Sequence, residues 1–526
     1  MTPENGTYWQ LIVSAAERHP NRLILTDDHR RSLTSRELHD AACATAAAFA
    51  ARGIGHGTVV SWQLPTTLET MVVMAALARL GAVQNPIIPM LRESEVGFIT
   101  GQLASEFLLV PEVWRGFDHG GLARALSAQC GFEVIIVDQQ SAPAAGALRL
   151  PCGDVDALPQ PPAPNDDTRW VYYSSGTTAA PKGVRHTDRS VIAGSAGVVQ
   201  MVGATTGDVN PIPFPISHIG GAAMLAGALQ TGMRLVLFEA FDPQTTPFAI
   251  AAHNPTFLGT ATPFFVAFMS AQRTHGVRPL FPALRACLAG GAPITPELGR
   301  QVRETFAVPG IANAWGLTEF PVATSPAPDA APEVLDYTVG PPVPGVAVRV
   351  VDANGEPVAV GHEGELRLKG PQCFLGYVDA TLDIEAFDSD GWFRTGDVGC
   401  LDSDGNVRVT GRIKDAIIRN AENISALEVE SILAAHPAVA DVAVIGVPDY
   451  RTGERVCAVV VPATGHVVSL ESLVELCASR GLSRHKYPER LELVDDLPRN
   501  LTGKVLKKDL RAAFSRAAEP ARPSHA

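Results

Sequence analysis

Helical and strand patterns alternate between residues 35 and 239, and this alternation constrains the fold more than any other feature of the sequence. Apolar residues recur with helical spacing in 35–51 and 66–83, and the apolar segment 59–64 between them has the pattern of a strand. Further strand patterns occur at 107–110, 133–138 and 234–239. Strands separated by helices favour parallel sheets with crossover connections. The sequence therefore predicts an α/β fold.

The chain also carries signs of a division into domains. At roughly 150 residues per domain, its 526 residues predict about three or four folding units. The segment 159–167 is rich in Pro and then acidic, which is typical of a surface connector. Strand-rich sequence at 345–370 gives way, beyond residue 411, to helices and strands in an α+β order. We therefore place a domain boundary at 410–415.

Charge and cysteine content exclude several classes of protein. The formal net charge of -13, from 55 acidic and 42 basic residues, argues against a nucleic-acid-binding surface. Eight scattered cysteines without CxxC or zinc-ligand spacing indicate reduced thiols in a cytoplasmic protein. The first ten residues, MTPENGTYWQ, do not have the pattern of a secretory signal. The uncharged segment 210–233 is interrupted by three prolines, so we interpret it as buried core and predict no membrane span.

The segment 172–184, YYSSGTTAAPKGV, has the composition of a phosphate-binding loop. Hydroxyl side chains and backbone N–H groups next to a glycine can donate to anionic oxygens, and Lys182 supplies charge. The segment is not a Walker A loop, because GxxxxGK[ST] is absent. Taken alone, it could also be an exposed turn rich in Ser, Thr and Gly.

Three further segments are weak signals when each is taken alone. A loop at 314–319, AWGLTE, combines an aromatic ring that can stack on a base with a carboxylate that can hold a metal ion. Asp397 follows a glycine turn and can accept hydrogen bonds from ribose hydroxyls, although an Asp in a hairpin turn needs no such function. Lys504 can equally be a surface lysine, since Lys507 and Lys508 follow it.

Taken in order, eight segments resemble the motifs of the adenylate-forming superfamily of acyl-CoA synthetases, peptide-synthetase adenylation domains and luciferases. The segments are YYSSGTTAAPKGV (172–184), PFPISHIGG (213–221), LAGGAP (288–293), AWGLTE (314–319), GELRLKGPQCFLGY (364–377), RTGDVG (394–399), GRIKD (411–415) and LPRNLTGK (497–504). A chance match to all of them in order is very improbable. The resemblance covers nearly the whole chain.

This resemblance implies an architecture and a set of ATP contacts. The N-terminal domain, 1–410, is expected to contain two α/β subdomains and a β-barrel-like subdomain, and 411–415 to be a hinge to a small mobile α+β domain, 416–526. The residues implied at the β- and γ-phosphates are Ser174, Ser175, Gly176, Thr177, Thr178 and Lys182. Those implied around adenine are Gly291, Ala292, Pro293, Asn313, Ala314, Trp315, Gly316 and Leu317, with Trp315 stacked on the base.

The resemblance also implies the chemistry. Thr318 is expected at the α-phosphate, Asp397 and Arg412 at the ribose, and Thr178 and Glu319 at a magnesium ion. Lys504 is the expected catalytic residue, because a carboxylate that attacks the α-phosphorus needs positive charge at the phosphate oxygens. Pyrophosphate leaves and an acyl-adenylate forms. Coenzyme A then takes the acyl group after the C-terminal domain rotates about Lys414.

The acid and the thiol channel are less constrained by the sequence. The residues expected at the acyl pocket are His218, Gly220, Gly221, Thr260 and Gly290. The glycines among them leave space, which favours a medium-chain, alicyclic or ring-bearing acid, and the resemblance is to cyclohexanecarboxylate and medium-chain acyl-CoA ligases. The coenzyme A path is expected along Arg419, Asn420, Ala421 and Glu422, where family members commonly have a pair of glycines.

Two other functions remain open at this point. An enzyme of this family can load its acyl group onto a carrier protein in trans, and reaction with free coenzyme A distinguishes the two cases. A non-catalytic nucleotide-binding protein is a further alternative, although Lys504, Glu319 and Thr178 would then have no purpose. The sequence leaves open whether the chain is a monomer or a homodimer.

Overall fold

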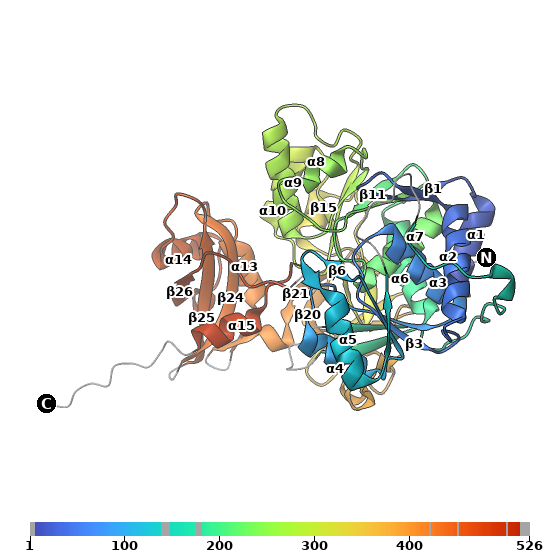
Figure 1. Cartoon of the computed structure of the whole chain (residues 1–526). Helices are drawn as coiled ribbons and strands as arrows, with labels where there is room; N and C mark the ends of the chain where they lie inside the picture. The colour runs from blue at the N-terminus through green and yellow to red at the C-terminus, as the bar shows by residue number, and fades with distance from the viewer. Residues whose placement is uncertain are drawn as a thin grey trace.

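The computed structural model describes residues 6–137, 148–174, 181–419, 422–449, 452–500 and 503–515. Figure 1 shows a large N-terminal part and a smaller C-terminal lobe, drawn in orange and red, that stands to one side of it. This is the predicted division into a large mixed α/β N-terminal domain and a small C-terminal domain.

A mainly parallel sheet forms the first layer of the N-terminal domain. Its strand order is β19-β10-β9-β4-β3-β5-β8, where β4, β3, β5, β8 and β9 run parallel and β10 and β19 complete the edge in antiparallel register. The strands are β3 Val59–Trp62, β4 Val83–Pro86, β5 Phe107–Val110, β8 Glu133–Ile136, β9 Trp170–Ser174, β10 Lys182–His186 and β19 Gly376–Tyr377. The helices between them are α2 Ser35–Ala50, α3 Leu68–Leu80, α4 Glu93–Gln102 and α5 His119–Cys130, and the short hairpin β6 Val113–Trp114 with β7 Phe117–Asp118 precedes α5.

The helices of this layer begin and end where the sequence supplies caps. The Thr34 hydroxyl accepts from the Glu37 N–H at the start of α2, and Glu37 returns a bond to the Thr34 N–H, which forms a capping box. At the start of α3 the Thr67 hydroxyl accepts from the Thr70 N–H, and Gly81 ends the helix with a φ of 69°, a left-handed conformation that a glycine adopts without strain. The predicted α/β alternation is therefore confirmed.

Two smaller sheets complete the α/β part. They have the strand orders β11-β12-β1-β2 and β13-β14-β15-β16. Their strands are β1 Leu23–Asp27, β2 Ser32–Thr34, β11 Val209–Ile212, β12 Arg234–Leu237, β13 Phe257–Leu258, β14 Ala286–Gly290, β15 Ile311–Leu317 and β16 Phe320–Thr324. The associated helices are α1 Tyr8–Arg18, α6 Asp188–Met201, α7 Ile219–Thr231, α8 Thr246–Ala251, α9 Thr262–His275, α10 Pro296–Phe306 and α11 Pro332–Tyr337.

Antiparallel strands dominate the last part of the N-terminal domain and the C-terminal domain. The former has the order β17-β18-β20-β21, with β17 Ala347–Val351, β18 Gly364–Lys369, β20 Phe393–Leu401, β21 Val407–Arg412 and the short helix α12 Asp383–Ala386. The latter contains β22 Ile417–Arg419, β23 Glu422–Ile424, β24 Val439–Asp449, β25 Gly453–Pro462, β26 Arg490–Leu493, α13 Ala426–Leu433, α14 Leu470–Ser479 and α15 Lys507–Phe514. A separate apolar cluster, which includes Val429, Val456 and Leu473, forms its core.

Residues 210–233, 314–319 and 397 follow their expected local structure to different degrees. The uncharged segment 210–233 folds as most of β11 and then α7, and no helix in the described ranges is long and apolar enough to cross a membrane. The expected loop at 314–319 was wrong for its first part, because β15 continues through Leu317. Asp397 likewise lies inside β20 and not in a hairpin turn, although Gly396 before it has a φ of 69°.

Candidate active site

Strand pairing in the seven-stranded sheet brings two of the predicted ATP contacts, Ser174 and Lys182, opposite each other. β9 and β10 pair with Ser174 opposite Lys182, so these two residues flank the predicted phosphate loop. The predicted contacts Ser175, Gly176, Thr177 and Thr178 lie outside the described residues. On the other side of β10, Val184 pairs with Tyr377 of β19.

Tyr377 joins two of the predicted residues, although the sequence did not identify it. Its hydroxyl donates a hydrogen bond of 2.9 Å to Glu319 Oε1, and the Lys182 ammonium lies 5.2 Å from the centre of its ring. Burial, with the nearby Glu319 carboxylate, raises the pKa of Tyr377 well above its usual value, so the phenol stays a donor. The feature of the sequence that could have identified Tyr377 is its position at the end of the segment 364–377.

A second group of residues is built on the register of β20 and β21. These strands pair Asp397 with Arg412, and Arg412 Nε lies 2.6 Å from Asp397 Oδ1. The Trp315 indole N–H donates to Asp397 Oδ2 over 2.8 Å. Asp397 is only 2% exposed, and its Oδ1 has an ion-pair contact but no aligned hydrogen bond from any described residue, which leaves it able to accept from a ligand hydroxyl.

Lys504 reaches this group from the C-terminal domain. Burial and the neighbouring Arg412 lower its pKa to about 8, whereas Asp397 and Asp415 act in the opposite direction. Gly503, which precedes Lys504, lies close to the start of α9: a methyl group added to it would be 3.5 Å from the Ala261 methyl. In this orientation of the C-terminal domain, Lys504 is close enough to Asp397 and Arg412 for their charges to act on it.

The wall predicted to enclose adenine follows from the register of β14 and β15. Ala289 pairs with Asn313 and Gly290 with Ala314, so 313–317 runs beside the segment that contains Gly291, Ala292 and Pro293. The Asn313 Oδ1 atom is buried without a hydrogen-bond partner in the described ranges. An unpaired buried acceptor, together with Asp397 Oδ1, fits a nucleotide whose amino and hydroxyl groups would donate to them.

Trp315 is only 8% exposed and belongs to the apolar cluster around Phe320 and Leu366. Most of its ring therefore packs into the protein, and its N–H is fixed by Asp397. Stacking on adenine, which the resemblance implies, would use the remaining exposed part. The role of Trp315 that the contacts support directly is to orient the Asp397 carboxylate.

Thr318 is held by a histidine that the sequence did not single out. His186 Nε2 lies 2.8 Å from the Thr318 carbonyl oxygen, and His186 Nδ1 lies 2.8 Å from the Ser190 hydroxyl. Burial lowers the pKa of His186 to about 4, so its imidazole is neutral at ordinary pH. His186 follows the phosphate-loop segment by two residues, and this position is the only feature of the sequence that could have identified it as a site residue.

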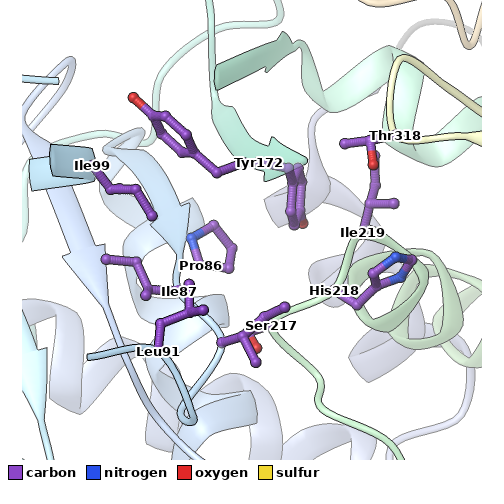
Figure 2. Close-up of a pocket in the computed structure, with 11 residues that line it drawn as sticks. Pro86, Ile87, Leu91, Ile99, Tyr172, Ser217, His218, Ile219 and Thr318 are labelled. Atoms are coloured by element: carbon purple, nitrogen blue, oxygen red, sulfur yellow. The ribbon is translucent and has the colours of Figure 1, made fainter. Parts of the chain in front are cut away.

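Thr318 also lines a small cavity together with His218 (Figure 2). Its volume is about 30 Å³. Its walls are made by Pro86, Ile87, Ile88, Leu91, Ile99, Tyr172, Tyr173, Ser217, His218, Ile219 and Thr318. Of the residues predicted for the acyl pocket, His218 lines this cavity, whereas Gly220, Gly221, Thr260 and Gly290 do not.

Gly221 does not leave the space that its small size suggested. A methyl group added there would meet the Ile216 carbonyl oxygen at 2.1 Å, so the backbone of a neighbouring segment occupies this position. The glycine is required for close packing at the start of α7. Gly220 has a related local role, because its N–H donates to His218 Nδ1 over 3.1 Å and His218 thereby caps α7.

The predicted hinge and thiol path lie around the domain boundary. Lys414 is in a single helical turn, Ile413–Asp415, between the two domains. Arg419 forms an ion pair with Glu489 over 2.8 Å within the C-terminal domain. Glu422 begins β23, and Asn420 and Ala421 lie outside the described residues.

Comparison with known proteins places this geometry in context. The family model described as AMP-binding enzyme matches residues 12–378, and that described as AMP-binding enzyme C-terminal domain matches residues 428–504. The chain is 31% identical over 517 residues to a medium-chain fatty-acid–CoA ligase of Escherichia coli, covering 97% of this chain and 90% of that protein.

Two further relatives widen the range of chemistry. A salicyl-AMP ligase / salicyl-S-ArCP synthetase of Mycobacterium tuberculosis is 34% identical over 517 residues, which cover 95% of this chain and 90% of the relative. The crystal structure of ATP-bound MatB from Rhodopseudomonas palustris superposes with a TM-score of 0.85 at 26% identity, covering 97% of this chain and 99% of that chain.

Proposed function

Because this chain belongs to the AMP-binding enzyme family of adenylate-forming ligases, we propose that it activates a carboxylic acid with ATP and transfers the acyl group to coenzyme A. The observation that supports this most directly is the meeting of Lys504 with Asp397 and Arg412 at one site. Positive charge beside a buried acceptor for ribose suits the first half-reaction, in which negative charge develops at the α-phosphate.

In the first step, a carboxylate oxygen of the acid forms a bond to the α-phosphorus while the bond to pyrophosphate breaks. Lys504 donates to the phosphate oxygens, and Asp397 accepts from the ribose and so positions the phosphorus. Lys182 holds the departing phosphates. Glu319 and Thr178 are the residues that would hold Mg²⁺, which neutralises phosphate charge when it is bound.

In the second step, the thiol of coenzyme A attacks the acyl carbon, a thioester bond forms and AMP leaves. Lys504 is not needed for this step. Rotation about Lys414 would remove it and bring the segment 418–423 to the site.

The identity of the carboxylic acid and of the acyl acceptor is tested by experiment. One relative is a fatty-acid–CoA ligase and the other bears the name of a salicyl-S-ArCP synthetase, so transfer to a carrier protein is a second candidate. We propose a medium-chain, alicyclic or ring-bearing acid. The test is pyrophosphate release and thioester formation with acetate, octanoate, cyclohexanecarboxylate, benzoate and salicylate, with and without coenzyme A. Pyrophosphate without thioester would favour the carrier protein, and no pyrophosphate with any acid would contradict both.

The adenylation rate should fall at alkaline pH. Lys504 has a pKa of about 8 and acts as a cation, so raising the pH through 8 removes its charge. We expect kcat/KM for ATP to fall about tenfold per pH unit well above pH 8. Lys504→Arg keeps its charge in this range and should lose this slope, whatever its absolute rate. A wild-type profile that is flat to pH 9.5 would contradict the assignment.

Removal of the Tyr377 hydroxyl should weaken magnesium binding. Tyr377→Phe deletes the hydrogen bond to Glu319 and leaves that carboxylate free to turn. Loss of such a partner of a metal ligand costs about 10- to 100-fold in metal affinity, and we expect the half-saturating Mg²⁺ concentration to rise about tenfold. Tyr337→Phe, at an exposed tyrosine, is the control. An unchanged magnesium dependence in Tyr377→Phe would show that Glu319 does not hold the ion.

A further inference from the structure

Two residues that line the cavity behind His218, Tyr172 and Ser217, carry hydroxyl groups that no described residue pairs. The hydroxyl oxygens of Tyr172 and Ser217 have no hydrogen-bond partner in the described part of the chain. Both residues line the cavity, and they are 3% and 2% exposed. Buried hydroxyls are almost always paired, because burial without a partner costs free energy. A ligand group that pairs with them would account for their position.

His218 offers a third polar group at the same place. Its Nδ1 accepts from the Gly220 N–H over 3.1 Å, so the proton of the neutral imidazole lies on Nε2. Burial lowers the pKa of His218 to about 4, which keeps the ring neutral at ordinary pH. Nε2 makes no hydrogen bond to any described residue, and it is therefore available to donate to a ligand.

The remaining walls limit the chemistry of that ligand. Pro86, Ile87, Leu91 and Ile99 are apolar, and no Asp, Glu, Lys or Arg among the described residues lines the cavity. A charged group would lie there without a counterion, so a neutral group is required. The volume of about 30 Å³ is enough for a small polar substituent.

We propose that the carboxylic acid substrate bears a hydroxyl group, which enters this cavity and hydrogen-bonds to Tyr172 and Ser217. The inference rests on the proposed function, because that function places the reacting carboxylate next to Thr318, which lines the same cavity. Figure 2 shows Ser217, His218 and Thr318 around this space, with Tyr172 above it. Tyr172 and Ser217 are thus specificity-determining residues.

The expected consequence is discrimination between an acid and its hydroxylated counterpart. A site built to hydrogen-bond a substrate hydroxyl rejects the analogue that lacks it, because the polar groups of the protein are then left unpaired. We expect kcat/KM for the preferred hydroxylated acid to exceed that of its parent by about 10- to 100-fold.

The test is ATP–pyrophosphate exchange with matched pairs: benzoate with 2- and 3-hydroxybenzoate, and octanoate with 3-hydroxyoctanoate. In the double variant Tyr172→Phe with Ser217→Ala, the ratio of hydroxylated to parent acid should fall at least tenfold, and each single variant should lower it in part. Tyr8→Phe is the matched control, because this buried hydroxyl already donates to the Ala222 carbonyl over 2.8 Å. Its ratio should stay at the wild-type value. Thermal melting verifies that each variant is folded, and the single variants serve if the double variant is not.

Three outcomes would overturn the inference. Equal efficiency for every hydroxylated acid and its parent would contradict it while leaving the proposed function intact. If the ratio of kcat/KM for hydroxylated and parent acid is unchanged in the double variant while KM for coenzyme A rises, the thiol arm of coenzyme A uses the cavity instead. No exchange with any acid, including acids beyond these pairs, would contradict the proposed function and this inference with it.

Discussion

Lys504→Ala should abolish most of the adenylation activity, with a fall of about 10²- to 10³-fold in ATP–pyrophosphate exchange. Lys504 lies beside Asp397 and Arg412, and it brings the charge of the C-terminal domain to the position expected for the α-phosphate. Loss of one positioned donor to developing negative charge has an effect of this size in other enzymes. KM for ATP should change less than kcat, because the lysine acts mainly in the transition state.

Two comparisons make this result specific. Lys508→Ala removes an exposed lysine from the same segment and should leave the exchange rate unchanged. Conversion of a supplied acyl-adenylate to thioester should survive in Lys504→Ala, because that step does not use this side chain. Equal losses in the two half-reactions would indicate a structural defect of the C-terminal domain. An exchange rate within threefold of wild type would refute the catalytic assignment.

Asp397→Ala should have the second-largest effect, on both ATP use and stability. The carboxylate is the expected acceptor for two ribose hydroxyls, and hydrogen bonds to a charged group contribute about 1.5–3 kcal/mol each. We expect kcat/KM for ATP to fall about 10²- to 10³-fold, since each 1.4 kcal/mol is a factor of ten. The change also leaves the Trp315 N–H and the Arg412 guanidinium without their partner, and should lower the free energy of unfolding by about 2 kcal/mol.

Asp388→Asn separates these two effects. Asp388 is another well-buried carboxylate of the same domain, and it lies 2.6 Å from Arg349 and 2.9 Å from Arg367. Its substitution should lower stability without a specific effect on ATP. Thermal unfolding and initial rates at varied ATP measure the two quantities. If Asp397→Ala and Asp388→Asn reduce kcat/KM for ATP equally, Asp397 does not hold the ribose.

The fold class and the order of the functional segments follow from local patterns. The spacing of apolar residues predicts α2, β3 and α3, because each element depends on neighbours within a few positions. The boundary between strand and turn was harder to predict. Leu317 and Asp397 lie in strands, since pairing with β16 and β21 extends the ladders past glycines that favour turns.

The candidate site divides in the same way. Lys182, Asp397 and Lys504 are visible in the sequence because they stand in recognisable segments, and Asn313 because it directly precedes the segment 314–319. Tyr377 and His186 were missed as site residues, because their partners, Glu319 and Thr318, lie 58 and 132 positions away along the chain. No periodicity carries information over such a separation.

The α/β architecture and the adenylate-forming family therefore follow from the sequence, because both depend on local pattern and on the order of the segments, and the same segments predict the residue types of the proposed ATP site. Tertiary structure alone decided which of these side chains meet. Sheet register places Asp397 opposite Arg412, and domain orientation brings Lys504 to both. Packing also places the Ile216 carbonyl, and not a substrate, against Gly221, and it buries the hydroxyls of Tyr172 and Ser217 without a partner among the described residues. Unfilled space and unpaired atoms exist only once the segments are packed.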